Sequence, residues 1–171
     1  MRAVIDALER LGIDYYVSGS VAASVHGVMR QSQDIDIVVA IEPRDFGALA
    51  DVLRPTSAIA EPIDYGSFAM ASVIDQETAE KVDLILRRPD PFERSAMERR
   101  LCADIPGLGS AWVVSVEDLV LAKLVWSGGT SELQLRDCEQ LLRINVTAID
   151  RGYLERWAAS LGVADLLRQV S

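Results

Sequence analysis

The stretch GSVAASVHGVMRQSQDIDIVV, from Gly19 to Val39, decides the fold that the sequence predicts. It begins with a Gly-Ser pair at the expected start of a helix of small residues. It ends in an apolar strand that contains two aspartates, Asp34 and Asp36. Because side chains alternate between the faces of a strand, both carboxylates lie on one face and the isoleucines beside them lie on the other.

Two like charges on a strand that a helix covers carry a free-energy cost. Burial and mutual repulsion disfavour the charged form unless a cation or hydrogen-bond donors neutralise the carboxylates. Mg²⁺ is the first cation to consider, because it is a hard ion that prefers oxygen ligands. The pair Asp34 and Asp36 is therefore the first indication of function.

A third carboxylate, Asp83, interrupts the apolar segment KVDLIL. If the strand expected over 81–87 lies beside the strand expected over 34–40, Asp83 joins the two earlier aspartates over one site. Three converging carboxylates suit two divalent ions, which clamp the attacking and leaving oxygens of a phosphoryl displacement.

The Gly-Ser pair provides the phosphate side of the same chemistry. Gly19 lets the backbone approach a phosphate, and the N–H groups of a helix N-terminus and the hydroxyl of Ser20 donate hydrogen bonds. A different interpretation stays open for the carboxylates: Asp34 as a turn residue and Asp36 as a polar residue on a solvated sheet face.

Composition limits the classes of protein to consider. The chain has 171 residues, half of them hydrophobic and a quarter charged, which suits one domain with a core. We expect a main unit over 1–115 and a helical region over 116–171. The formal net charge of −9 argues against a nucleic-acid coat protein and against stable DNA binding. No apolar run approaches 18 residues, so no membrane segment is expected and the protein is predicted to be cytoplasmic.

The hydrophobic pattern predicts alternating helices and strands, hence an α/β (α+β) fold with a mixed β-sheet flanked by helices and a C-terminal helical extension. Segment 56–66 is expected to be irregular. The expected helices are 2–11, 19–27, 44–54, 91–100, 116–126, 132–144 and 150–169, the last in one piece or in two pieces with a break at Gly162. The expected strands are 14–18, 34–40, 67–74, 81–87 and 112–115.

Other polar and aromatic residues have structural interpretations. His26 is expected to pack or to cap a helix. The tryptophans Trp112, Trp126 and Trp157 are expected to anchor the core or helix packing rather than to stack on bases.

The order of these motifs resembles the nucleotidyltransferase fold of the DNA polymerase β type, in particular its minimal bacterial branch with the AbiEii-like toxins of toxin–antitoxin pairs. The resemblance rests on GSVAASVHG, RQSQDIDIVV and VDLIL and covers residues 14 to 90. It continues more loosely into the segment EDLVLAKLVWSGGTSELQLRDCEQLL.

The resemblance implies roles for the residues of the main motifs. Gly19 and Ser20 would hold the triphosphate of a nucleotide, and Asp34 and Asp36 would bind the metal ions. Asp83 would be the third carboxylate, either as a ligand or as the base for the incoming hydroxyl. The family more often has Gly-Gly where this chain has Gly-Ser.

Further nucleotide-binding residues are implied around these motifs. Arg30 and Ser32 match the approach to the aspartate pair and would contact phosphate, and Lys123 and Asp137 match a later lysine and acid. From the residues alone, Lys123 and Asp137 also fit exposed positions on amphipathic helices.

The activity implied by the resemblance is transfer of a nucleoside monophosphate from a nucleoside triphosphate to a hydroxyl, with release of pyrophosphate and with Mg²⁺, or alternatively Mn²⁺, as cofactor. An RNA or protein acceptor suits a toxin-like role with an antitoxin partner, and a small molecule such as an antibiotic suits a resistance role. The alternative from another class is a non-catalytic nucleotide-binding or antitoxin-like regulatory protein on the same fold. Convergence of the three aspartates on an open cleft distinguishes the two.

Overall fold

The computed structural model describes residues 1–29, 34–87 and 90–171. In these residues an eight-stranded sheet runs in the order β3-β5-β6-β2-β1-β8-β7, with β4 paired to β5. The strands are β1 (Tyr15–Val17), β2 (Asp34–Val39), β3 (Ser57–Ile59), β4 (Ile63–Asp64), β5 (Phe68–Asp75), β6 (Lys81–Arg87), β7 (Leu101–Ile105) and β8 (Gly109–Val113).

The sheet is mixed, as the sequence predicts. Strand β2 is antiparallel to β1 and parallel to β6, while β5 and β6 form an antiparallel pair. The helices are α1 (Arg2–Leu11), α2 (Gly19–Val25), α3 (Phe46–Leu53), α4 (Pro91–Arg99), α5 (Val116–Ser127), α6 (Glu132–Ile144), α7 (Arg151–Ser160) and α8 (Ala164–Val170), with a short 3₁₀ helix η1 (Pro43–Asp45). The predicted fold class is confirmed.

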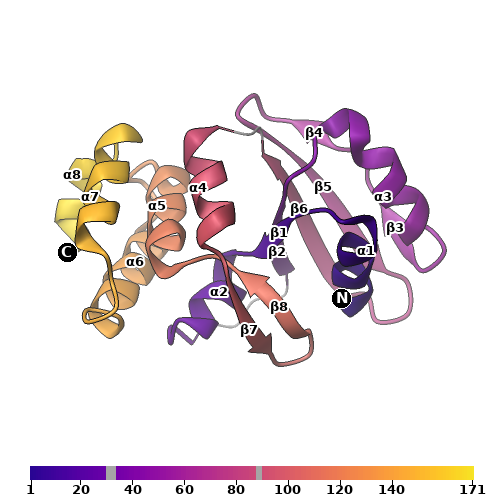
Figure 1. The fold of residues 1–171 in the computed structure, drawn as a ribbon, viewed down its shortest axis with the longest axis horizontal. Helices are drawn as coiled ribbons and strands as arrows, with labels where there is room; N and C mark the ends of the chain where they lie inside the picture. The colour runs from indigo at the N-terminus through magenta and orange to yellow at the C-terminus, as the bar shows by residue number, and fades with distance from the viewer. Residues whose placement is uncertain (30–33, 88–89) are drawn as a thin grey trace.

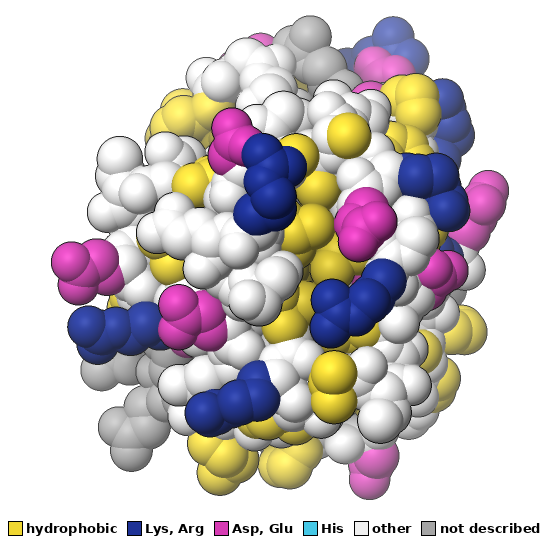
Figure 2. Space-filling view, turned by 90° about the vertical axis from the view of Figure 1, so that its left-hand side faces the viewer, with side chains coloured by type: hydrophobic (Ala, Val, Ile, Leu, Met, Phe, Trp, Pro, Cys, Tyr) yellow, Lys and Arg dark blue, Asp and Glu magenta, His cyan; other side chains and the backbone are white. Residues whose placement is uncertain are grey.

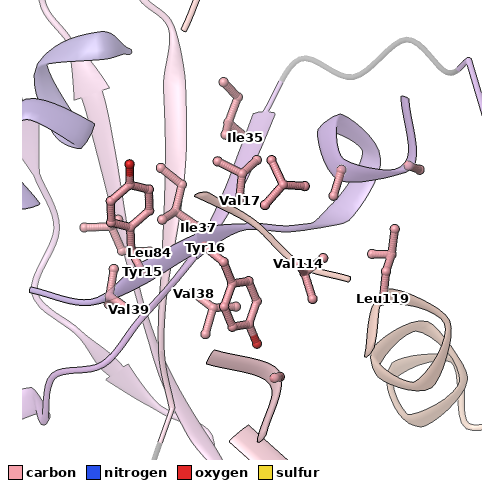
Figure 3. Packing of buried hydrophobic residues seen from close by; sticks show 14 of the residues in the cluster. Tyr15, Tyr16, Val17, Ile35, Ile37, Val38, Val39, Leu84, Val114 and Leu119 are labelled. Atoms are coloured by element: carbon pink, nitrogen blue, oxygen red, sulfur yellow. The ribbon is translucent and has the colours of Figure 1, made fainter. Parts of the chain in front are cut away.

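Helices cover both faces of the sheet. Tyr15 and Tyr16 are consecutive in β1 and point to opposite sides (Figure 3). The hydroxyl of Tyr15 donates to Glu9 of α1, and that of Tyr16 donates to Glu93 of α4. Helices α1 and α3 lie together at the right of Figure 1, and α5 to α8 gather at its left.

The apolar face of β2 lies in the core, which fits the predicted alternation. Ile35 is 6% exposed, and Ile37 and Val39 have no exposed surface. At about 25 cal/mol per Å² of buried apolar surface, side chains of this size stabilise the fold by roughly 2 kcal/mol each. The opposite face of the same strand carries the two aspartates.

Some sequence expectations for the sheet are wrong. Segment 56–66 is not irregular throughout, because β3 and β4 lie in it and pair with β5. The last strand is Gly109–Val113 rather than 112–115, and it pairs with β7, which the hydrophobic pattern does not indicate. Short edge strands form through pairing with a neighbour, so their own residue pattern is a weak signal.

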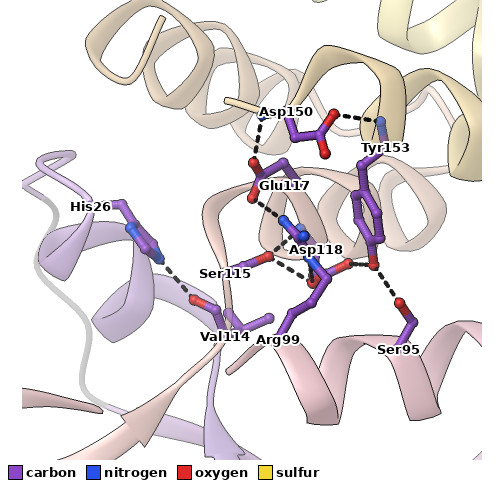
Figure 4. Close-up of polar contacts among 9 residues, drawn as sticks. All are labelled: His26, Ser95, Arg99, Val114, Ser115, Glu117, Asp118, Asp150 and Tyr153. Carbon is purple, nitrogen blue, oxygen red and sulfur yellow. Dashed lines mark hydrogen bonds and ion pairs between the residues drawn. The ribbon is translucent and has the colours of Figure 1, made fainter. Parts of the chain in front are cut away.

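The C-terminal helices are fixed to α4 by a buried polar network (Figure 4). Arg99 of α4 pairs with Glu117 at 3.1 Å and with Asp118 at 3.6 Å. The hydroxyl of Tyr153 in α7 donates to Asp118 at 2.6 Å. This network holds α5 in place, and α5 carries Lys123.

The helices of residues 1–29, 34–87 and 90–171 include none with the length and apolar character that a membrane-spanning helix needs.

Candidate active site

The three aspartates singled out in the sequence lie on one face of neighbouring strands. Strand β2 pairs with β6 so that Asp36 lies opposite Asp83 and Asp34 lies opposite Lys81. Because paired residues of adjacent strands point to the same side of a sheet, all four side chains share one face. The expectation that segment 81–87 lies beside segment 34–40 is confirmed.

A cleft of about 160 Å³ lies beside Asp36. Its lining joins the start of α2, the polar face of the sheet and helix α5. The lining residues are Ser18, Gly19, Asp36, Met70, Ile85, Arg87, Leu119, Ala122, Lys123, Trp126 and Gln134. The first predicted phosphate-binding residue, one aspartate and the predicted lysine therefore meet at one cleft.

Gly19 is in direct contact with Asp36. Its φ is +60°, and a Cβ built on it would lie 1.8 Å from Oδ2 of Asp36. No other residue type fits without displacement of the carboxylate or of the backbone.

Ser20 is adjacent to the cleft but does not line it. Its hydroxyl is buried and has no hydrogen-bond partner among the described residues. A buried hydroxyl without a partner is uncommon, because it gives up its hydrogen bonds to water. Ser18, which sequence reasoning missed, lines the cleft instead.

Lys81 is a second residue that sequence reasoning missed. Its ammonium donates to Oδ2 of Asp83 at 2.8 Å and lies 3.3 Å from Oδ2 of Asp34. The hydrogen bond with Asp83 is the largest cause of the raised pKa of Lys81. The other oxygen of Asp83 accepts a hydrogen bond from the hydroxyl of Ser72 at 2.6 Å. The position of Lys81, two residues before Asp83 in a strand, is the signal that places it on the same face.

The surroundings of Asp36 disfavour the ionised form of its carboxyl group. Burial is the main cause of its raised pKa, and the charges of Asp83 and Asp34 raise the pKa further. The charges of Lys123 and Lys81 act in the opposite direction. A pKa raised by burial together with neighbouring carboxylates is typical of functional sites.

Lys123 and Asp137 form a buried ion pair. The ammonium of Lys123 lies 2.7 Å from Oδ2 of Asp137, and their side chains are only 6% and 7% exposed. It also donates to Gln134 at 2.9 Å. The alternative interpretation of exposed helix positions is therefore wrong for both residues. Lys123 lines the cleft, and Asp137 lies behind it.

Two predicted site residues, Arg30 and Ser32, lie outside the described residues. Their predicted contact with phosphate stays a prediction. His26 has a structural contact, because its Nε2 lies 2.8 Å from the carbonyl oxygen of Val114 (Figure 4).

The aspartates have the donor chemistry for a metal ion that is shared with a substrate. In residues 1–29, 34–87 and 90–171, no three acidic, histidine or cysteine side chains are grouped so as to hold a metal ion by themselves. Mg²⁺ usually keeps several waters and binds through one or two carboxylates together with phosphate oxygens. Asp34 and Asp83 fit that mode, because the ammonium of Lys81 lies near Oδ2 of both and shows that one cation can contact the two carboxylates.

Aromatic rings lie at one end of the cleft. Trp126 of α5 is 58% exposed, and its ring centroid lies 5.2 Å from that of Phe68 on β5. Phe68 stacks in turn on Tyr65 at 5.1 Å. Trp126 is therefore not a core residue, although its contact with Phe68 is a helix-packing contact of the kind expected from the sequence. Trp112 is also partly exposed, at 39%. Trp157 packs on Phe92, as expected.

A larger cavity of about 490 Å³ lies between the end of β2 and α4. Two of the arginines that line it form ion pairs: Arg87 with Glu93, and Arg100 with Asp14 at 2.7 Å. On the face of the molecule in Figure 2, basic side chains are likewise interspersed with acidic and hydrophobic ones. Neither surface has the character of a binding site for a polyanion.

No protein-family model matches the sequence, and no curated protein is similar to it at significant level. Solved structures are similar in fold. The antibiotic-resistance factor ANT(2'')-Ia has a TM-score of 0.62 at 15% identity, over 98% of this chain and 91% of its own; it has also been solved in complex with adenylyl-2''-tobramycin.

Two other solved structures are also similar to this chain in fold. An antigenic nucleotidyltransferase-like protein from Paracoccidioides brasiliensis has a TM-score of 0.57 at 15% identity, over 97% of this chain and 90% of its own. The lincosamide antibiotic adenylyltransferase LnuA, solved with lincomycin, has a TM-score of 0.55 at 15% identity, over 82% and 93%. The chain thus has the fold of nucleotidyltransferases.

Proposed function

We propose that the protein is a metal-dependent nucleotidyltransferase that moves a nucleoside monophosphate from a nucleoside triphosphate to a hydroxyl acceptor. The observation that carries the proposal is the placement of Asp34, Asp36 and Asp83 on one sheet face, with Asp36 in the lining of a cleft that Gly19 and Lys123 also line. The fold similarity supports the reaction class. The AbiEii-like branch rests on the sequence resemblance alone.

The three aspartates would hold Mg²⁺, or alternatively Mn²⁺, together with phosphate oxygens of the nucleotide. When bound, the metal neutralises the charge that develops on the phosphates and on the leaving pyrophosphate. Lys123 provides a fixed positive charge at the opposite wall of the cleft, and Asp137 orients it. Gly19 lets a phosphate approach the backbone.

The transfer step is an in-line displacement. The acceptor oxygen attacks the α-phosphorus, and the bond from this phosphorus to pyrophosphate breaks. The proton of the acceptor hydroxyl passes to a carboxylate, for which Asp83 is the candidate, as the base or as the third ligand. Ser20, with its buried unpartnered hydroxyl, and Arg30 and Ser32 are proposed as further phosphate contacts.

A small hydroxylated molecule is the acceptor class that we favour. ANT(2'')-Ia with adenylyl-2''-tobramycin and LnuA with lincomycin both have small-molecule acceptors or products bound. The net charge of −9 and the paired arginines also disfavour a large RNA surface. An RNA or protein acceptor, with an antitoxin partner, is the second candidate and rests on the resemblance.

The experiment is transfer of label from each α-³²P-labelled nucleoside triphosphate with Mg²⁺. The acceptors are aminoglycosides, lincosamides, total bacterial RNA and protein, and the double variant Asp34→Ala/Asp36→Ala is the control. Label on one acceptor class with the wild-type protein but not with the variant supports the proposal and names the acceptor. Tight nucleotide binding without transfer to any acceptor supports a non-catalytic nucleotide-binding protein instead.

A further inference from the structure

We propose that Lys81 is a built-in counter-ion of the carboxylate set and that a divalent metal ion binds by displacing its ammonium group. The proposal rests on the proposed function, because it takes the aspartates as the metal site. It adds a residue that controls how strongly the metal ion binds.

The ammonium bridges two of the three carboxylates. It lies 2.8 Å from Oδ2 of Asp83 on its own strand and 3.3 Å from Oδ2 of Asp34 on the neighbouring strand. The first distance is that of a charge-assisted hydrogen bond, and the second is that of a longer ion-pair contact. A cation is therefore already present where the aspartates of β2 and β6 meet.

A metal ion and this ammonium compete for the same oxygen. Oδ1 of Asp83 accepts the hydrogen bond of Ser72, and Oδ2 accepts that of Lys81. A Mg²⁺ ion bound to Oδ2 at about 2.1 Å would lie close to the ammonium, and two positive charges at such a distance repel each other. The hydroxyl of Ser72 carries no charge and is compatible with a metal-bound carboxylate.

Lys81 is free to move away without loss of core packing. It is the first residue of β6, and its side chain is 34% exposed, whereas that of Asp83 is 12% exposed. A lysine side chain has a flexible four-carbon stem, so the ammonium can turn toward solvent while the strand stays in place. In the same exchange Oδ2 of Asp34, whose side chain is 45% exposed, loses its contact with this ammonium.

The test measures binding of Mn²⁺ to the protein alone, without nucleotide, by electron paramagnetic resonance of free Mn²⁺. The variants are Lys81→Gln, which removes the charge, and Lys81→Arg, which keeps it. Arg54→Gln is the control, because Arg54 pairs with Asp51 in an exposed position elsewhere on the surface.

We expect Lys81→Gln to bind Mn²⁺ at least about fivefold more tightly than the wild type, within the usual range for coupling between two sites. Lys81→Arg and Arg54→Gln should keep the affinity of the wild type. In EDTA, Lys81→Gln should melt at a lower temperature than the wild type, because the carboxylates lose their counter-ion, and Mn²⁺ should raise its melting temperature more. Equal or weaker Mn²⁺ binding by Lys81→Gln would overturn the proposal.

Failure of this proposal is distinguishable from failure of the proposed function. Nucleotidyl transfer by the wild type together with unchanged Mn²⁺ affinity in Lys81→Gln overturns only the role of Lys81. Absence of transfer with tighter Mn²⁺ binding in Lys81→Gln supports the counter-ion role and counts against the transferase activity. If Lys81→Gln is unfolded in EDTA, refolding by Mn²⁺ supports the proposal, and failure to refold with Mn²⁺ overturns it.

Discussion

Gly19 leaves the space that the carboxylate of Asp36 occupies: a Cβ on Gly19 would lie 1.8 Å from Oδ2 of Asp36. Gly19 also has a φ of +60°, which disfavours any side chain. The two motifs of the sequence, the Gly-Ser pair and the aspartate pair, are thus in contact in the fold. The glycine is needed both for the backbone conformation and for the position of the carboxylate.

Replacement of this glycine should separate the two requirements. We expect Gly19→Ala to lose nucleotidyl transfer and to destabilise the fold by about 2–4 kcal/mol, because overlap with Asp36 adds to backbone strain. Gly12→Ala is the matched control: its φ is +66° and nothing lies within 4 Å of its Cβ. It should cost about 1–2 kcal/mol from strain alone and keep the activity. Equal unfolding free energies for both variants would contradict the overlap.

The carboxylate of Asp36 should reduce stability in the metal-free protein. Burial and the neighbouring aspartates raise its pKa, so its ionised form destabilises the fold at any pH above the ordinary value of about 3.9. We expect Asp36→Asn to be more stable than the wild type by on the order of 1 kcal/mol at pH 7 in EDTA. The gain should shrink as the pH falls and vanish below about 3.9, where the carboxyl is protonated in both states. Urea unfolding at several pH values measures this, and a gain that grows toward low pH would be the wrong sign.

The ion pair of Lys123 and Asp137 should matter for stability and activity separately. Lys123→Met removes a buried, oppositely charged partner of Asp137 and should cost about 3–5 kcal/mol in unfolding free energy. The double variant Lys123→Met/Asp137→Leu should recover most of that stability, since neither charge of the pair is then left buried. It should not recover transfer, because Lys123 lines the cleft. Recovery of activity in the double variant would show that Lys123 acts only in folding.

Trp126 and Trp157 allow a comparison between an exposed tryptophan at the cleft and a packed one elsewhere. Trp126 is exposed at the cleft, whereas Trp157 packs between Phe92 and Tyr153. We expect Trp126→Ala to raise the KM for the nucleotide or the acceptor, since stacking of a ring is worth about 1–3 kcal/mol, with little change in stability. Trp157→Ala should lower the unfolding free energy by about 2–4 kcal/mol with KM unchanged. A large loss of stability in Trp126→Ala would instead indicate a packing role.

The sequence predicts those parts of the site that a local pattern specifies. Alternation in the strand of Asp34 and Asp36 places both on one face, and the apolar segment around Asp83 indicates a buried neighbouring strand. That Asp83 lies opposite Asp36 follows from the parallel pairing, which no local pattern encodes. The short strands β3, β4 and β7 depend on pairing in the same way.

Other parts of the site depend on tertiary contacts. The burial of Lys123 depends on packing of α5 against α6, so its helix pattern alone also fits an exposed position. Trp126 looks like a core residue by type, yet it lies at the edge of the cleft because α5 meets β5 there. Lys81 is the exception, since its spacing from Asp83 would have placed it on the polar face.

The measurement that tests the central claim most directly is the rate of pyrophosphate release from a nucleoside triphosphate, with an acceptor and Mg²⁺. The comparison is between the wild type, Asp36→Asn at the cleft and Asp45→Asn at the larger cavity. The account predicts Mg²⁺-dependent release by the wild type and by Asp45→Asn, and a loss of at least about 100-fold in Asp36→Asn. Release that survives in Asp36→Asn, or that is lost in Asp45→Asn instead, would contradict it.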